Sequence, residues 1–208
     1  MSTADDLPLA CKCGKVRGVL HDASPSRVNR VVCYCADCQA FAHFLERPDL
    51  LDEHGGSDIV QVAPGNVVFH QGVENIAAVR LGPKGPFRWY ATCCKTPLGN
   101  TVQPSLPFVG FVHEIFQGKI DVFGPPTGKI WAQEASSPPP NATAKVPVGL
   151  IATTVRKILG WKLVGKAWPN PFFERGRAVP RYPVRILERS ERDALRAKCG
   201  PRTTAATG

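Results

Sequence analysis

Seven of the eight cysteines lie in three short clusters, and this pattern constrains the fold of the 208-residue chain more than any other feature. The clusters are Cys11-Lys12-Cys13, Cys33-Tyr34-Cys35-Ala36-Asp37-Cys38 and Cys93-Cys94. Disulfides within a cluster would be strained, and nothing in the sequence indicates an oxidising compartment. Thiolates one or two residues apart can turn their sulfur atoms toward one ion, and zinc favours four such ligands in a tetrahedron. We therefore expect one or two Zn²⁺ ions, with iron–sulfur chemistry as the alternative.

Seven ligands divide into a set of four and a set of three. A four-ligand zinc site is closed and structural, whereas three ligands leave one position for water or substrate. Adjacent residues in an extended strand point to opposite faces, so Cys93 and Cys94 would not easily bind the same ion. Strand geometry thus favours Cys93 joining Cys33, Cys35 and Cys38, which would close that site.

The residues before the Pro-rich stretch predict a β-rich fold. Short β-branched runs alternate with turn residues such as Pro64-Gly65 and Gly82-Pro83, a pattern typical of closely spaced strands. The expected strands are Val16–Leu20, Asn29–Tyr34, Ile59–Val62, Val67–His70, Ile76–Leu81 and Lys119–Phe123. We therefore predict a mainly β domain over residues 1–132.

A Pro-rich linker is expected at residues 133–147, followed by a basic helical extension over residues 148–208. Four apolar residues at helical spacing predict an amphipathic helix of about 14 residues: Ile151, Val155, Ile158 and Leu159. A basic amphipathic helix can lie on a membrane surface, and a weaker alternative is that residues 150–198 bind a membrane surface or nucleic acid, but packing of the helix on its own domain is the commoner outcome and the one we expect. A second helix is expected after Ser190, with Ser190 as its cap and Gly200-Pro201 as its stop. Between them, residues 168–173 predict an extended segment laid over a hydrophobic surface.

The net charge of +9 belongs to the last third of the chain. Residues 141–208 carry 14 basic and 4 acidic residues, whereas residues 1–140 carry 12 and 13. The basic part lacks the alternation of aromatic and basic residues seen in nucleic-acid-binding motifs, so nucleic acid is not expected as a partner. A solvated basic tail, or one that meets an acidic partner, is the simpler interpretation. With no membrane span and no secretory signal in the sequence, we expect a cytoplasmic protein.

The cysteine motifs resemble those of the glutathione-dependent formaldehyde-activating (GFA) family, which shares its domain with centromere protein V. The similarity covers roughly residues 9–125. The residues that carry it are Cys11-Lys12-Cys13-Gly14, Cys33-Tyr34-Cys35-Ala36-Asp37-Cys38-Gln39, and Arg88-Trp89-Tyr90 leading to Cys94-Lys95-Thr96-Pro97-Leu98. The residues around these motifs, such as Gln39-Ala40-Phe41-Ala42-His43 and Thr96-Pro97-Leu98-Gly99-Asn100, resemble an uncharacterised branch of the family.

This resemblance implies a zinc-stapled fold of the β-tent kind with two zinc sites. It implies that Cys11, Cys13 and Cys94 belong to a structural site, and that Cys33, Cys35 and Cys38 bind the zinc near which the chemistry occurs. Two departures concern the structural site, since Ala91 stands where the family has a further cysteine and Cys93 is an addition. The resemblance favours Cys93 completing the structural site, against strand geometry, and the sequence leaves both options open.

The function that the resemblance implies is a carbon–sulfur lyase that forms or cleaves a thiol–aldehyde adduct, S-hydroxymethylglutathione in the family. Such chemistry needs a general acid or base, for which the candidates are Tyr34, Asp37 and His43. Arg88, Lys95 and Lys12 are candidates to receive the carboxylates of glutathione, or to offset the charge of the thiolates. The alternative is a non-catalytic zinc-stapled scaffold or binding module with a basic tail for an acidic partner. The oligomeric state does not follow from the sequence.

Overall fold

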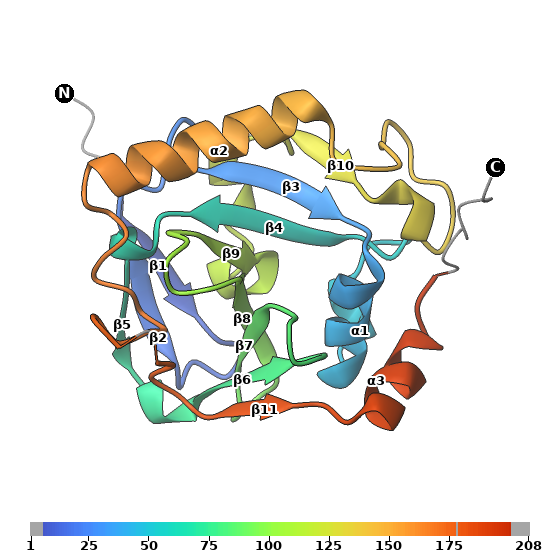
Figure 1. Ribbon diagram of the computed structural model, residues 1–208, viewed down its shortest axis with the longest axis horizontal. Helices are drawn as coiled ribbons and strands as arrows, with labels where there is room; N and C mark the ends of the chain where they lie inside the picture. Colours follow the sequence, from blue (N-terminus) through green and yellow to red (C-terminus); the bar gives the residue numbers. More distant parts are fainter. Residues whose placement is uncertain (1–5, 178, 201–208) are drawn as a thin grey trace.

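Two β-sheets form the framework of this computed structural model, which describes residues 6–177 and 179–200 (Figure 1). The mainly β fold class predicted from the sequence is therefore confirmed. The ends of the predicted segments 1–132 and 148–208, at residues 1–5 and 201–208, lie outside the described residues. No helix in the described part of the chain combines the length and the apolar character needed to cross a bilayer.

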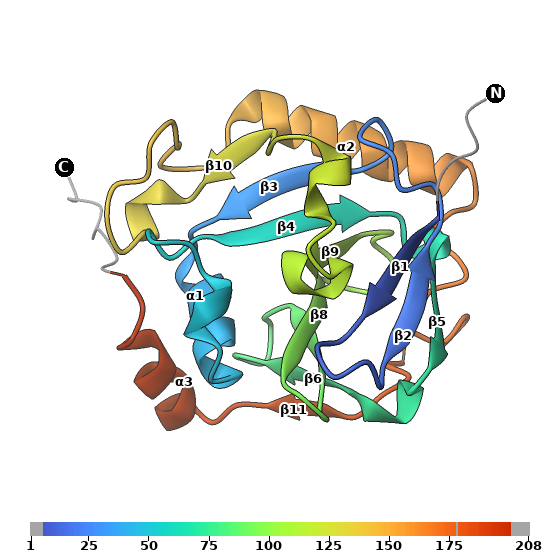
Figure 2. The same ribbon diagram turned by 180° about the vertical axis from the view of Figure 1, so that it is seen from behind.

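The smaller sheet is antiparallel and has three strands in the order β1-β2-β5, with bounds β1 (Leu7–Ala10), β2 (Arg17–Leu20) and β5 (Val67–Gln71). Alternate residues of β1 and β2 are buried, including Leu9 and Leu20, as expected for strands with one face on a core. Figure 2 shows this sheet standing beside the larger one, with β1 and β2 in front. The hairpin between β1 and β2 carries the first cysteine cluster.

The larger sheet has eight strands. In order across the sheet they are β10 (Gly128–Ile130), β3 (Asn29–Cys33), β4 (Ser57–Val62), β9 (Val109–Val112), β8 (Thr96–Thr101), β7 (Phe87–Ala91), β6 (Ile76–Arg80) and β11 (Val184–Ile186). The six central strands pair antiparallel, and β10 and β11 add parallel strands at the two edges. The order brings β3, which ends at Cys33, into the same sheet as β7 and β8, which flank Cys93 and Cys94.

Aromatic side chains fill the core between the sheets. Trp89 is fully buried and stacks on Phe172 with 4.6 Å between ring centroids, and its indole N–H donates to Thr101 Oγ1 at 2.9 Å. Phe172 and Phe173 come from the extended segment after the Pro-rich stretch and are also fully buried. The prediction that this segment covers a hydrophobic surface is therefore confirmed, and residues of the expected C-terminal extension contribute to the main core.

Three α-helices lie among the described residues: α1 (Ala36–Phe44), α2 (Val148–Leu163) and α3 (Arg189–Arg196). The expected amphipathic helix is α2, but the expectation that its apolar stripe packs on the domain is wrong for Ile151, Val155 and Leu159, which are 48%, 47% and 55% exposed. The expected cap of α3 is also wrong. Glu188 is the cap, because its backbone N–H donates to the Glu191 carboxylate in a capping box, so the helix begins before Ser190.

The predicted strand at Lys119–Phe123 is wrong as well, since the short 3₁₀ helix η5 (Ile120–Phe123) occupies this stretch. Gly118 and Gly124 adopt φ of +77° and +71°, so the chain turns at both ends and leaves no room for a strand. The other 3₁₀ segments are η1 (Pro48–Leu50), η2 (Pro64–Asn66), η3 (Val73–Asn75), η4 (His113–Phe116) and η6 (Ala132–Glu134).

Candidate metal centres

The four-cysteine cluster consists of Cys11, Cys13, Cys93 and Cys94, whose Sγ atoms all lie within 4.8 Å of one another. The Sγ–Sγ distances are 3.6 Å for Cys11–Cys13, 3.9 Å for Cys11–Cys93, 3.4 Å for Cys13–Cys93 and 3.8 Å for Cys93–Cys94. A tetrahedron with Zn–S bonds of about 2.3 Å has sulfur–sulfur edges of about 3.8 Å. The thiol spacing therefore fits a closed tetrahedral site for a metal such as zinc.

The hairpin between β1 and β2 turns Cys11 and Cys13 toward the same point. Gly14 N–H donates to the Cys11 carbonyl at 2.8 Å, and Gly14 has a φ of +75°, a left-handed conformation that strains other residues. Val16 N–H points at Cys11 Sγ at 3.3 Å. The glycine after the second cysteine thus permits the tight turn that brings both sulfur atoms together.

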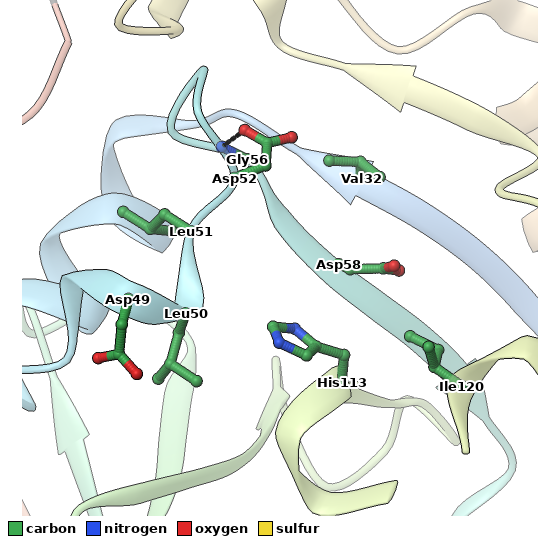
Figure 3. A pocket seen from close by; sticks show the side chains of 9 residues that line it. All are labelled: Val32, Asp49, Leu50, Leu51, Asp52, Gly56, Asp58, His113 and Ile120. Carbon is green, nitrogen blue, oxygen red and sulfur yellow. Dashed lines mark hydrogen bonds between the residues drawn. The ribbon is translucent and has the colours of Figure 1, made fainter. Parts of the chain in front are cut away.

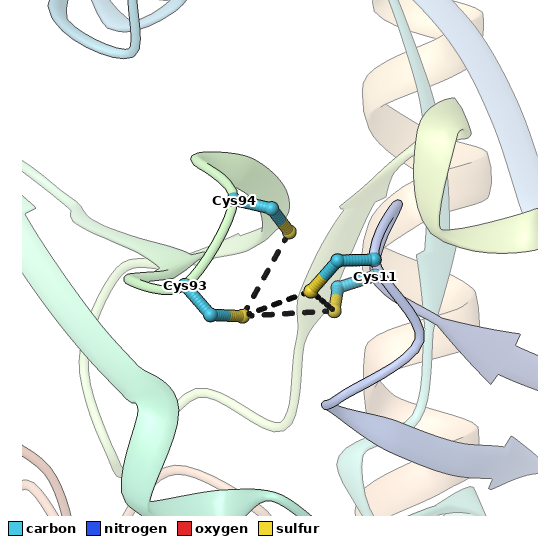
Figure 4. Close-up of side chains that lie close together, drawn as sticks. Cys11, Cys93 and Cys94 are labelled. Atoms are coloured by element: carbon cyan, nitrogen blue, oxygen red, sulfur yellow. Dashed lines mark hydrogen bonds between the residues drawn. The ribbon is translucent and has the colours of Figure 1, made fainter.

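Cys93 and Cys94 lie in a turn between β7 and β8 rather than in a strand, and Figure 4 shows both side chains facing Cys11. Lys95, the last residue of this turn, has a φ of +55°. The alternation of side chains along a strand therefore does not apply here, and the expectation that strand geometry sends Cys93 to the other cluster is wrong. The structure places Cys93 where the family resemblance puts it, with Cys11, Cys13 and Cys94.

Hydrogen bonds favour the thiolate form of Cys94. Burial opposes the charge, but hydrogen bonds from the Thr96 hydroxyl and from the backbone of Cys13 and Thr96 lower the pKa of Cys94 to about 6. The Thr96 Oγ1 atom lies 3.1 Å from Cys94 Sγ and also accepts the Lys12 N–H at 2.9 Å. Because the thiolate is the metal ligand, this environment prepares Cys94 for metal binding.

The three-cysteine cluster consists of Cys33, Cys35 and Cys38, whose Sγ atoms also lie within 4.8 Å of one another. The Cys35 and Cys38 sulfur atoms are 3.3 Å apart. Cys33 ends β3, Cys35 caps the N-terminus of α1, and Cys38 lies in the first turn of that helix. The strand-to-helix turn therefore brings three thiols together, and a tetrahedral metal ion held there would need one further ligand.

The N-terminus of α1 is anchored by Glu134. Its Oε2 atom accepts the Ala36 N–H at 2.7 Å, and its carbonyl accepts the Gln39 side-chain amide, also at 2.7 Å. The first N–H groups of a helix lack partners within the helix, so a carboxylate at this end stabilises it. Glu134 lies in η6, about a hundred residues from α1, and nothing in its surrounding sequence marked it as part of this site.

Arg88 brings a positive charge to the three-cysteine cluster. Its Nη1 lies 4.0 Å from Cys38 Sγ, its residue is only 3% exposed, and its guanidinium lies over the Phe41 ring. Hydrogen bonds from Cys33 and Cys35, together with the charge of Arg88, hold the pKa of Cys38 well below the usual thiol value. Of the three predicted basic residues, Arg88 therefore lies where it can offset the charge of the thiolates.

A pocket of about 330 Å³ lies against the three-cysteine cluster, and its lining residues are Cys35, Asp37, Pro86, Arg88, Trp131, Glu134 and Arg196. Arg196, from α3, forms an ion pair with Asp37. The Nε atoms of Arg88 and Arg196 are buried and have no hydrogen-bond partner within residues 6–177 and 179–200. These Nε atoms have almost no accessible surface and do not reach a ligand in the pocket. The guanidinium groups of Arg88 and Arg196 still bring positive charge to the pocket lining, which suits an anionic group.

The three predicted acid–base candidates have different surroundings. Asp37 lines this pocket, whereas His43, in the last turn of α1, is not among the described residues that line it. Tyr34 is fully buried and its hydroxyl donates to Asp52 Oδ2 at 3.0 Å; burial and the Asp52 charge raise its pKa. Tyr34 is therefore poorly suited to exchange a proton at neutral pH.

A second pocket, of about 270 Å³, is lined by His113 and by the acidic residues Asp49, Asp52 and Asp58 (Figure 3). Asp52 Oδ1 accepts the Gly56 N–H at 2.7 Å, and Asp58 pairs with Arg30 at 2.7 Å. These carboxylates hold β3, β4 and the loop before β4 together. We therefore assign them a structural role and not a metal-binding one.

A protein-family model described as a family of unknown function, DUF6151, matches residues 2–182. The chain belongs to this family. The DUF6151 match includes both cysteine clusters and α2 and ends before β11 and α3, so Arg196 lies beyond it.

The DUF6151 chain was also compared with curated proteins and with solved structures. No curated protein matches it. A solved structure described as a Rhodobacter sphaeroides protein is 16% identical, with a TM-score of 0.41, and the match covers 58% of this chain and 97% of that one.

Proposed function

We propose that the chain is a zinc protein of the GFA type, a carbon–sulfur lyase that forms or cleaves a thiol–aldehyde adduct beside the three-cysteine cluster. In this proposal the four-cysteine cluster is the structural site that staples a β-tent-like domain. One observation carries the proposal: three convergent thiols adjoin a pocket whose lining includes the positively charged Arg88 and Arg196. The resemblance of the cysteine motifs to the GFA family supplies the reaction class.

The donor sets suit zinc in both clusters, since all seven ligands are thiols and their spacing within each cluster is compatible with one ion. Zinc held by three thiolates carries a net negative charge, so it activates water poorly and is better suited to holding a further thiol. The donor chemistry therefore favours a thiol substrate over hydrolysis.

The side chains of the pocket would bind the rest of the substrate. Glutathione is anionic, and the guanidinium groups of Arg88 and Arg196 provide charge-assisted donors for a carboxylate. In the forming direction a bond joins the thiol sulfur to the carbonyl carbon of the aldehyde, and the thiol proton ends on the new hydroxyl. Asp37 and Glu134 are the carboxylates in this pocket that can accept and return that proton.

Metal content and ligand binding test this function. We expect two zinc ions per chain by elemental analysis, and glutathione binding by calorimetry that weakens about tenfold to a hundredfold in Arg196→Ala, because a charged hydrogen bond is lost. Arg189→Ala, also on α3 but with its side chain 87% exposed, is the matched control. Formaldehyde exchange with glutathione, followed by NMR, should slow in Glu134→Gln or Asp37→Asn.

Two zinc ions without any glutathione or adduct binding would instead support the non-catalytic scaffold. A chain with fewer than two tightly bound ions would contradict the assignment of both clusters as zinc sites.

A further inference from the structure

The outer face of α2 is an apolar stripe on the surface of the molecule. It consists of Val148, Ile151, Val155, Leu159 and Leu163, which are 82%, 48%, 47%, 55% and 87% exposed. Their spacing of three or four residues places them along one side of the helix. Figures 1 and 2 both show α2 along the outer edge of the molecule, beside β3.

Contacts on the opposite side of α2 fix this orientation. Leu150 packs with the cluster of buried residues that includes Val31 and Ile130, and Thr154 Oγ1 accepts the Asn29 side-chain amide at 3.1 Å. Lys157 Nζ donates to the Ser26 carbonyl at 2.6 Å. The helix therefore has one apolar side on its own domain and a second that faces outward, and it cannot bury both against the chain.

The chain segment that contains α2 is basic, and of its basic residues Lys166 pairs with Asp22 at 3.8 Å. Between Glu134 and Glu174 the sequence has no acidic residue, and its five basic residues are Lys145, Arg156, Lys157, Lys162 and Lys166. Arg156 and Lys162 are exposed on α2 itself. Arg27 adds a further exposed positive charge near Lys157.

We propose that the outer face of α2 binds an anionic lipid surface, with the helix lying in the plane of the interface. Apolar side chains flanked by Arg and Lys are the composition of interfacial helices, which combine apolar burial with attraction to anionic lipids. At 16 residues α2 is shorter than the roughly 20 residues needed to span a bilayer. A second copy of this chain is a poorer occupant, because a symmetric contact over this face would bring the Arg156 and Lys162 charges of both copies into one interface.

Vesicle flotation with the full chain tests the proposal. We expect binding to vesicles of phosphatidylcholine with phosphatidylserine at low salt, weak binding to phosphatidylcholine alone, and release as salt rises. Ile151→Glu/Leu159→Glu should weaken binding about tenfold or more. The matched control is Val102→Glu/Val122→Glu, which changes two valines of similar exposure, 51% and 46%, outside α2 and should leave binding unchanged.

A second pair of variants keeps the test decisive if the acidic substitutions disturb the fold. Arg156→Gln/Lys162→Gln leaves the apolar stripe intact and should weaken binding about fivefold for each charge removed. Absence of binding to anionic vesicles at low salt would overturn the proposal, as would equal losses in the control pair. A dimer seen by light scattering that the I151E/L159E pair dissociates, without vesicle binding, would assign the face to a second copy instead.

Discussion

Replacing Cys93 by serine tests the arrangement of the four-cysteine cluster most directly. The Cys93 sulfur takes part in three of the four short Sγ–Sγ distances, 3.4, 3.8 and 3.9 Å, so its loss removes one corner of the tetrahedron. Structural zinc sites bind with about 10–16 kcal/mol, and an equal share for each of four thiolates is about 3 kcal/mol. We expect zinc affinity to fall about a hundredfold and the melting temperature to fall by about 6–12 °C.

Chelator competition with elemental analysis measures the affinity, and thermal unfolding by circular dichroism measures the stability. Cys199→Ser is the matched control, since Cys199 belongs to neither cluster and its sulfur lies 3.4 Å from backbone carbonyl oxygens of Ala36 and Leu195. It should retain two zinc ions. The reasoning would be refuted if Cys93→Ser kept both ions at unchanged affinity, or if the ion lost were the one that Cys33→Ser also loses.

Three further predictions concern stability. Trp89→Ala should lower the free energy of unfolding by about 3–5 kcal/mol in urea titrations, because it empties the centre of the aromatic core; a loss below 1 kcal/mol would contradict that role. Gly14→Ala should cost about 1–2 kcal/mol and weaken zinc binding, because φ is +75° there, while Gly149→Ala, in the exposed first turn of α2, should not destabilise. In the zinc-free chain, the pKa of Cys94 in the folded protein is about 6, against 9.0 for an unperturbed thiol. The stabilisation that the Cys94 thiolate gives the folded state is therefore fully present above about pH 9 and is lost as the pH falls through about 6. Urea midpoints at pH 6 and 9 measure it, and a Cys94→Ser variant that keeps the same pH slope would exclude this origin.

Local patterns in the sequence predict much of the fold. β-Branched runs between turn residues mark five of the strands, and the apolar spacing around Val155 marks α2. The other six strands, β1 and β7 to β11, were not predicted. In the hairpin of β7 and β8, Arg88, Pro97 and Gly99 interrupt any simple alternation, and a register shift between Trp89 and Tyr90 breaks it further. The outward orientation of α2 was also unpredictable, since the helix is apolar on two sides and only tertiary packing decides which side is buried.

The sequence identifies the seven cysteines that form the two clusters, but not how they divide between the clusters. Motif spacing identifies all seven thiols, whereas the place of Cys93 depends on a turn in which Lys95 takes a left-handed conformation. Glu134 and Arg196 reach the pocket from loops and helices about a hundred or more residues away from α1, so no local motif reveals them. Local motifs thus predict which thiols could bind metal, whereas the residues that line the neighbouring pocket come together through long-range packing.

The position of Arg196 on α3 has a consequence for a chain still on the ribosome. Residues 33–38 emerge early and can gather their thiols while the helix that lines the neighbouring pocket has yet to be synthesised. During that interval Cys35 would be open to oxidants and unintended metal ions, whose access the completed pocket, with Arg196 in its lining, restricts. A nascent chain stalled before α3 should therefore alkylate more rapidly at Cys35 than the mature protein does.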